Sequence, residues 1–286
     1  MRRIKKCTVF LLLLCLLLNL AGCAAAQKPL RVTLVLKTVT EVAEFWGTLL
    51  SGVEKAAEEY GVELKVLTSP REIDIDKQIE LIRQVTADKP DVMILSAADY
   101  DRCAEATEEA IAAGIGVVAI DTDVNAAGRA CFVGSNSYEI GLEMGRAMAS
   151  YLPEGGKVAV IQHMLTTTTG IERTRGVLDA LNEAGNIEIL GSFCCDNSTE
   201  QAQTITTELL SADPEIRGFV CTNEVCNVGA ANALVELGMG GRVYVVGCDN
   251  SQRQIQFLEQ NIIQAIVTQR PFNMGYMAVQ QAVRVA

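Results

Sequence analysis

The fold of this 286-residue chain is decided by the stretch VMILSAADYDRCAEATEEAIAAGIGVVAID, which runs from Val92 to Asp121. It opens with the apolar run Val92–Ser96, closes with a second apolar run, Val117–Asp121, and carries a helical stretch between them. Continuous runs of Val, Ile and Leu are typical of parallel strands buried on both faces. The stretch is therefore predicted to form a strand, a helix and a second strand, the repeating unit of a parallel α/β sheet.

The same alternation extends outward from this stretch on both sides. The stretches between strands repeat apolar residues every three or four positions, as Ile75, Ile79 and Ile82 do, which indicates helices with one buried face. We predict an α/β protein with doubly wound parallel sheets. The other predicted strands are Val32–Leu36, Val62–Leu67, Ala130–Gly134, Lys157–Gln162, Ile187–Phe193, Gly218–Thr222, Val243–Cys248 and Gln264–Thr268. Helix-capping pairs are predicted at Thr169 with Glu172, Ser198 with Gln201, and Ser251 with Gln254.

One junction breaks the alternation. The segment Thr122–Arg129 joins the predicted strands Val117–Asp121 and Ala130–Gly134, yet it is too short to hold a crossover helix. Such a break is expected where the chain passes from one α/β lobe to a second. We place the boundary near Asn136.

The first 22 residues have the order of a secretory signal peptide. Basic residues at the start are followed by the apolar run Val9–Leu18, which is short for a membrane span, and then by small residues. We therefore predict cleavage rather than an uncleaved anchor. The tetrad Leu20–Cys23 resembles a bacterial lipoprotein signal, which implies that Cys23 is diacylated and that two acyl chains hold the protein to the outside of the cytoplasmic membrane. Residues 23–30 would form the lipidated tether.

Charge and cysteine content exclude several classes of function. The predicted signal holds four basic and no acidic residues, so the mature chain carries a net charge of about −15 and repels the phosphate backbone of nucleic acids. Seven cysteines follow Cys23, and an odd number argues against a complete disulfide framework, so we expect buried thiols. With His163 as the only histidine and no close Cys-x-x-Cys pair, no metal site is predicted.

Polar and aromatic side chains follow the predicted strands at their carboxyl ends, the edge at which doubly wound sheets bind ligands. Carboxylates, amides and a guanidinium can donate to and accept from adjacent hydroxyls, and an aromatic ring can cover the apolar face of a sugar. The candidate ligand-binding residues are Phe45, Trp46, Asp121, Thr122, Arg173, Asn197, Asn223, Asp249 and Gln269.

Each candidate also has a purely structural interpretation. Asp or Asn at a strand end commonly caps the next helix or forms a turn. At least one of Phe45 and Trp46 is expected to face the core, and Arg173 could pair with a carboxylate on its own helix. The run Thr166–Thr169 fits either ligand-binding hydroxyls or a capped helix start. The argument for a binding site is that the candidates share one edge.

No catalytic constellation is present in the sequence. His163 has no identifiable partner, and there is no P-loop, no Gly-x-Gly-x-x-Gly after a strand and no His-Glu-x-x-His. Gly238–Gly241 precedes a strand rather than following one, which indicates a turn. We predict a binding protein that is not an enzyme and uses no cofactor.

Several motifs stand in order along the chain: Phe45-Trp46 before Gly52, Val117–Asp121, Val133–Asn136, Glu172–Gly176, Thr222–Glu224 with Gly229, Val245–Asp249, and Gln269. In this order they resemble the type I periplasmic solute-binding proteins of the ribose/galactose-binding branch, which serve ABC sugar importers. The resemblance covers residues 31–286. It implies two Rossmann-like lobes, residues 31–136 plus 270–286 and residues 137–269, joined by a three-strand hinge. It also implies a monomer that closes on a monosaccharide and is then recognised by a membrane permease.

The same resemblance implies roles for the candidate residues. Thr122 stands where the family often has arginine, the hinge has Ser135-Asn136-Ser137 in place of the usual Asp-Asn, and the first loop, Lys37–Glu44, is longer than in ribose binders. Together these departures argue against ribose itself and leave the ligand class unchanged. Asp121, Arg173, Asn223, Asp249 and Gln269 correspond to polar sugar contacts, Phe45 and Trp46 to stacking aromatics, and Asn197 to a further contact.

The family continues beyond the last helix with a further strand through the hinge, so we expect the C-terminus at Ala286 to be truncated. A ligand-sensing protein that reports to a membrane receptor or histidine kinase uses the same lobes and is the alternative function. A cytosolic repressor of this fold is disfavoured by the signal peptide, and an enzyme by the lack of a nucleophile–base pair.

Overall fold

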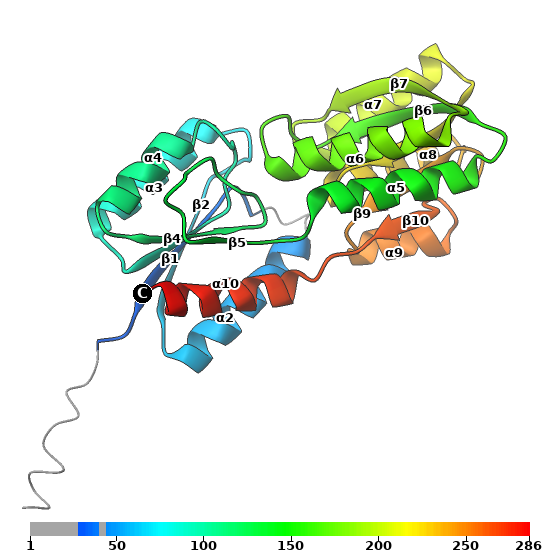
Figure 1. Ribbon diagram of the computed structural model, residues 1–286. Helices are drawn as coiled ribbons and strands as arrows, with labels where there is room; N and C mark the ends of the chain where they lie inside the picture. Colours follow the sequence, from blue (N-terminus) through cyan, green and yellow to red (C-terminus); the bar gives the residue numbers. More distant parts are fainter. Residues whose placement is uncertain (1–27, 40–43) are drawn as a thin grey trace, which may run out of the picture.

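The computed structural model describes residues 28–39 and 44–286, so the predicted signal peptide and Cys23 lie outside the described residues. Two five-stranded parallel sheets organise this part of the chain, each covered by helices on both faces (Figure 1). All ten predicted strands are present, each with ends within two residues of the prediction. The sequence-based assignment of two doubly wound α/β lobes is therefore confirmed.

The first lobe is built on the sheet with strand order β2-β1-β3-β4-β5. Alternate residues along its strands face two separate cores, one beneath α2 and α10 and the other beneath α3 and α4. The elements are β1 (Arg31–Leu36), α2 (Glu44–Tyr60), β2 (Glu63–Thr68), α3 (Ile75–Asp88), β3 (Val92–Leu95), α4 (Ala104–Ala112), β4 (Gly116–Ile120), β5 (Cys131–Val133) and, from the end of the chain, α10 (Pro271–Val285).

The second lobe repeats this plan on the sheet with strand order β10-β9-β8-β6-β7. One face packs against α5 and α6, and the other packs against α7, α8 and α9. The elements are α5 (Ser137–Tyr151), β6 (Gly156–Gln162), α6 (Thr168–Ala184), β7 (Ile187–Cys194), α7 (Thr199–Ala212), β8 (Ile216–Cys221), α8 (Glu224–Glu236), β9 (Tyr244–Cys248), α9 (Gln252–Glu259) and β10 (Ala265–Val267).

Both lobes contain helices that cross with their backbones almost in contact. In the first lobe, a Cβ on Gly52 of α2 would lie 2.0 Å from the carbonyl oxygen of Phe272 in α10. In the second lobe, a Cβ on Gly141 of α5 would lie 2.2 Å from the carbonyl oxygen of Arg173 in α6. Only glycine fits at such crossings, so the two helices of each pair are held in one close arrangement.

The helix-free segment after β4 stays inside the first lobe. It returns the chain to β5, which pairs in parallel with β4 from Val118↔Cys131 to Ile120↔Val133. After β5 the chain passes into the second lobe, whose first helix is α5. Asn136 caps α5 by accepting a hydrogen bond from the Glu139 N–H. Within the described chain, residues 134–136 and residues 268–270 link the two lobes (Figure 1).

Two of the three predicted helix starts have the expected caps, and the third is displaced. Ser198 accepts from the Gln201 N–H, and Ser251 forms the full capping box with Gln254. At α6 the cap is Thr167, which accepts from the Gly170 N–H, and not Thr169. The helix begins earlier than predicted because Thr167 has the extended backbone of a cap residue.

The two lobes contact each other across the cleft through the loop between β6 and α6. The Tyr100 N–H donates to the Thr166 carbonyl at 3.0 Å, and the Thr166 hydroxyl donates to the Ala98 carbonyl at 2.9 Å. The Asp123 N–H donates to the Thr168 hydroxyl at 3.0 Å. The cleft is therefore closed at this side, and the threonine run supplies the contacts.

All seven cysteines of the described residues are free thiols, and five of them are buried. Burial raises the pKa of Cys103 to about 11, so this thiol stays protonated. Among the described helices, none combines the length and the apolar character that crossing a membrane would require.

Candidate functional site

A cavity lies between the lobes and is lined by residues from both. Eight of the nine candidate residues line it, with Thr122 as the exception. The eight are Phe45, Trp46, Asp121, Arg173, Asn197, Asn223, Asp249 and Gln269.

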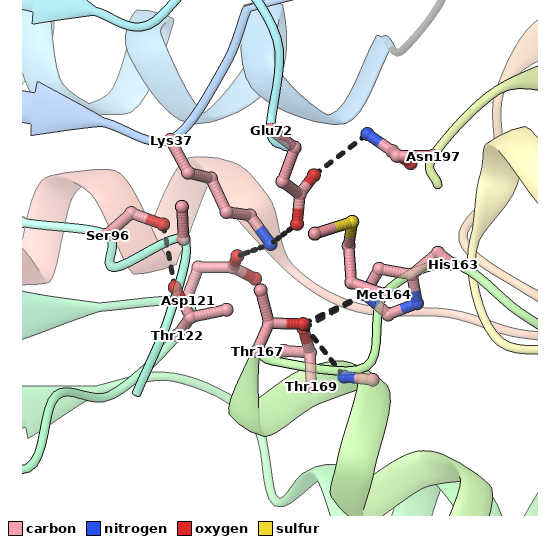
Figure 2. Close-up of polar contacts among 12 residues, drawn as sticks. Lys37, Glu72, Ser96, Asp121, Thr122, His163, Met164, Thr167, Thr169 and Asn197 are labelled. Carbon is pink, nitrogen blue, oxygen red and sulfur yellow. Dashed lines mark hydrogen bonds and ion pairs between the residues drawn. The ribbon is translucent and has the colours of Figure 1, made fainter. Parts of the chain in front are cut away.

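Thr122 does not reach the cavity, so its prediction as a ligand-facing residue is corrected. Its side chain is fully buried within the first lobe, where its hydroxyl donates to the Ala97 carbonyl at 2.7 Å and lies 3.1 Å from the Ser96 hydroxyl (Figure 2). Thr122 therefore ties the end of β4 to the end of β3.

Phe45 and Trp46 form an aromatic corner at the start of α2. Their rings meet edge to face, with centroids 5.1 Å apart. Trp46 is buried and belongs to the core beneath α2, while Phe45 is only partly buried. One aromatic thus anchors the wall of the cavity in the core, as predicted, and the other is more accessible.

An ion cluster in the first lobe was missed by the sequence analysis. The Lys37 ammonium lies 2.8 Å from Glu72 and 3.5 Å from Asp121, and all three side chains are almost completely buried (Figure 2). Burial alone would lower the pKa of Lys37, but Glu72 and Asp121 outweigh burial, so its pKa is raised and the ammonium stays charged. Lys37 directly follows β1, so the rule of inspecting strand ends could have found it.

Glu72 also connects the lobes. Its second oxygen accepts a hydrogen bond of 2.8 Å from the Asn197 amide of the second lobe (Figure 2). Asn197 in turn accepts from the Asn223 amide at 2.8 Å, and Asn223 caps α8 by accepting from the Cys226 N–H at 3.0 Å. A continuous chain of polar contacts therefore runs along the wall of the cavity from one lobe to the other.

Arg173 reaches the cavity and not the surface of its own helix. Its guanidinium is buried and donates to the Thr222 carbonyl at 2.9 Å. The nearby carboxylates pair elsewhere, since Glu172 bonds Arg175 and Asp179 accepts from Tyr138. Within residues 28–39 and 44–286, the Arg173 Nε–H has no hydrogen-bond acceptor.

Asp249 and Gln269 form a further part of the cavity wall. The Gln269 amide donates to Asp249 Oδ1 at 2.8 Å, and the Glu224 N–H donates to Asp249 Oδ2 at 3.0 Å. Asp249 has a left-handed backbone, with φ 77°, as does Asp121, with φ 61°. Such strained positions at two corresponding strand ends are typical of sites where side-chain direction matters.

His163 lies at the floor of the cavity and is neutral. Its ring nitrogens contact two hydroxyls, Thr222 at 2.8 Å and Thr169 at 3.2 Å. Burial holds its pKa well below the usual value, and the positive charges of Lys37 and Arg173 act in the same direction. The neutral imidazole holds these hydroxyls in place beside the cavity.

The cavity as a whole has more acid than base. Among the described residues that line it, four carboxylates, including Glu224, stand against two cations, Lys37 and Arg173. Burial, followed by the charge of Asp249, raises the pKa of Glu224 to about 7. This charge distribution disfavours anionic ligands and suits neutral polyols.

Comparison with known proteins assigns the chain to a family. A sequence model of the periplasmic binding protein domain matches residues 33–286. The D-allose-binding periplasmic protein of Escherichia coli is 26% identical over 268 residues, covering 91% of this chain and 84% of the relative. The D-ribose/D-allose-binding protein of Pseudomonas aeruginosa is 26% identical over 266 residues, covering 90% and 82%.

A solved structure agrees with these relatives. The glucose-galactose binding protein GanP from Geobacillus stearothermophilus superposes with a TM-score of 0.85 at 27% identity, covering 91% of each chain. Proteins of this family bind substrates for transport and are not enzymes, as the sequence predicted. The chain belongs to the periplasmic binding protein family, with the type I fold of its ribose/allose-binding branch.

Proposed function

We propose that the protein captures a monosaccharide between its lobes and delivers it to the permease of an ABC importer. The observation that carries this proposal is the buried cavity wall, in which the Arg173 Nε–H and Glu224 Oε2 have no hydrogen-bond partner among the described residues. A ring of hydroxyls can satisfy both, because each hydroxyl donates and accepts. Phe45, which is only partly buried, would cover an apolar ring face.

The names of the related proteins support the same class of ligand. The relatives named above carry D-allose, D-ribose, glucose and galactose in their names, and the cavity here contains the neutral polar groups that recognise such ligands. The polar contacts would come from Asp121, Arg173, Asn197, Asn223, Asp249 and Gln269, and the stacking surface from Phe45 with Trp46 behind it.

The cellular setting belongs to the same proposal. The order of the first 23 residues supports export and a diacylated Cys23, which would tether the closed lobes outside the cytoplasmic membrane, near the permease. Labelling with a radioactive or alkyne-bearing fatty acid tests this directly. Loss of the label in Cys23→Ala is the expected result, and an equally labelled variant would rule out the anchor.

A thermal-shift panel tests the ligand class. A soluble chain beginning at Gln27 is heated with D-allose, D-ribose, D-galactose, D-glucose and, as contrasts, gluconate and a nucleoside. We expect one or a few neutral monosaccharides to raise the melting temperature, because a ligand that binds only the folded chain stabilises it. A rise with gluconate or the nucleoside, and none with the sugars, would contradict the proposal.

A further inference from the structure

We propose that Glu224 couples ligand capture to lobe closure: one oxygen of its carboxylate holds the opposite lobe, and the other binds a hydroxyl of the ligand. This inference rests on the proposed function, because it requires a hydroxyl-bearing ligand in the cavity. It adds a residue that the sequence analysis did not select as a ligand contact.

The first half of the coupling is a contact between a carboxylate and a helix start across the cleft. Glu224 is the first residue of α8 in the second lobe, and its Oε1 accepts from the N–H of Glu44, the first residue of α2 in the first lobe, at 3.4 Å. The positive end of the α2 dipole favours a carboxylate there. Closing the lobes is what brings these two helix starts together.

A second contact of the same kind runs in the opposite direction, and both contacts require the closed arrangement of the lobes. The side chain of the same Glu44 accepts from the N–H of Gln252, the first residue of α9 in the second lobe, at 3.2 Å. Each lobe thus places one carboxylate at a helix start of the other. Opening the cleft would separate both pairs.

The second half of the coupling is an oxygen that faces the cavity without a partner. Glu224 is 2% exposed and lines the cavity, and its Oε2 lies within hydrogen-bonding distance of no donor among the residues that the structure describes. The Ser251 hydroxyl and the Phe45 N–H approach the carboxylate closely enough to favour its charged form, but neither makes a hydrogen bond with Oε2. A buried acceptor left unpaired is costly, so a ligand hydroxyl that reaches it gains a hydrogen bond without displacing another.

Helix capping does not explain why Glu224 is buried. The Asn223 side chain already accepts from the Cys226 N–H, and Asp249 accepts from the Glu224 N–H. The Glu224 and Cys226 N–H groups at the start of α8 therefore have acceptors other than the Glu224 carboxylate. The carboxylate instead lies beside Asp249, whose charge together with burial raises the pKa of Glu224, and a hydroxyl donor from the ligand would relieve this repulsion.

Two substitutions separate the two halves. Glu224→Gln retains an amide oxygen that can accept from the Glu44 N–H but turns an NH₂ group toward the cavity in place of the acceptor. Glu224→Asp retains the charge but is one methylene shorter, so it loses its reach to α2. Glu236→Gln, at the far end of the same helix and bonded to Gln203, is the matched control.

The readouts are the Kd of the sugar that gives wild type its largest thermal shift, by calorimetry, and the radius of gyration by X-ray scattering with and without that sugar. We expect Glu224→Gln to weaken binding about tenfold or more, as for loss of a hydrogen bond to a charged group, yet to compact at saturating sugar. Glu224→Asp is expected to bind weakly and to remain more open than wild type. Glu236→Gln should behave as wild type.

The outcomes distinguish this inference from the proposed function. Wild type that binds a sugar while both Glu224 variants bind it with unchanged Kd would overturn the inference and leave the proposed function intact. If wild type binds no monosaccharide, the proposed function is wrong. The inference is then tested by the radius of gyration of the ligand-free chains. A Glu224→Asp chain more open than wild type supports the closing contact, and one equally compact overturns it.

Discussion

The two lobes bring similar polar atoms to the cavity but hold them in different ways. In the first lobe, Lys37, Glu72 and Asp121 are held by one another's charges. In the second lobe, Asn223 and Asp249 are held by N–H groups at the start of α8, which they cap while lining the cavity. One wall is thus an ion cluster and the other an extension of a helix start. Substitutions in the two walls should therefore lower the free energy of unfolding by different amounts.

The largest expected effect is on the ion cluster. Lys37→Met leaves two buried carboxylates without their cation, and breaking a buried pair in this way typically costs about 3–5 kcal/mol of the free energy of unfolding. Urea unfolding at neutral pH measures it. Lys55→Met is the control, because the pairs that Lys55 makes with Glu58 and Glu59 are exposed and contribute little to stability. Equal losses in the two variants would refute the contrast between the walls.

The next effect is a pH dependence that belongs to the second lobe. Burial and Asp249 raise the pKa of Glu224 from an ordinary 4.5 to about 7, against the opposing pull of the Ser251 hydroxyl and the N–H groups of Glu44 and Phe45. The folded chain therefore binds this proton more tightly than the unfolded chain. The resulting stabilisation is complete below about pH 4.5 and is lost as the pH rises to about 7.

Comparison of wild type with Glu224→Gln isolates the contribution of the Glu224 carboxyl group to the pH dependence of stability. Across that window, wild type should lose stability relative to the variant, by up to about 1.4 kcal/mol per pH unit. Urea unfolding at several pH values measures the difference. Two curves that run parallel through the window would show that Glu224 titrates normally.

A smaller effect tests whether second-lobe residues serve both the helix and the ligand. Asn223→Ala removes the cap of α8 and should cost about 1 kcal/mol of stability, together with a measurable loss of sugar affinity. Ser198→Ala removes the cap of α7 and should cost a similar amount of stability while leaving affinity unchanged. Calorimetric unfolding and sugar titration of both variants sharpen the comparison. If Asn223→Ala and Ser198→Ala bind the sugar with equal affinity, Asn223 serves only as a helix cap.

The smallest expected effect lies in the contacts between the lobes. Thr168→Ala removes the acceptor of the Asp123 N–H and should weaken sugar binding by a few-fold, in line with a neutral hydrogen bond of about 1 kcal/mol. Thr204→Ala removes an exposed hydroxyl that bonds only its own helix and should not change the Kd. A Kd equally unchanged in Thr168→Ala would mean that this contact does not contribute to closure.

The sequence predicted the sheets well because their signal is local. Runs such as Val92–Ser96 and Val117–Asp121 are continuous and apolar, so they identify strands without knowledge of the partners. It also predicted most of the cavity, because parallel strands bring their carboxyl ends to one edge. This rule places a residue at the edge but does not say where its side chain points. Asp121 has a left-handed backbone, and Thr122 after it turns back to bond Ala97.

The missed residues depend on contacts between distant segments. Glu72 lies in the loop after β2, and its pairing with Lys37 after β1 follows from the parallel pairing of these two strands, which a single sequence does not reveal. The interaction of Glu224 with α2 requires both lobes to be in place. The threonine run illustrates a mixed case, since Thr167 caps a helix while Thr166 and Thr168 reach the other lobe.

The glycine crossings limit how this molecule can deform. Because the backbones of α2 and α10, and likewise those of α5 and α6, meet almost without intervening side chains, neither pair has room to slide or tilt independently. Relative motion is then left to the few torsion angles of residues 134–136 and 268–270. We expect opening to follow a single angular coordinate, so two chromophores fixed anywhere on the opposite lobes would report the same rotation.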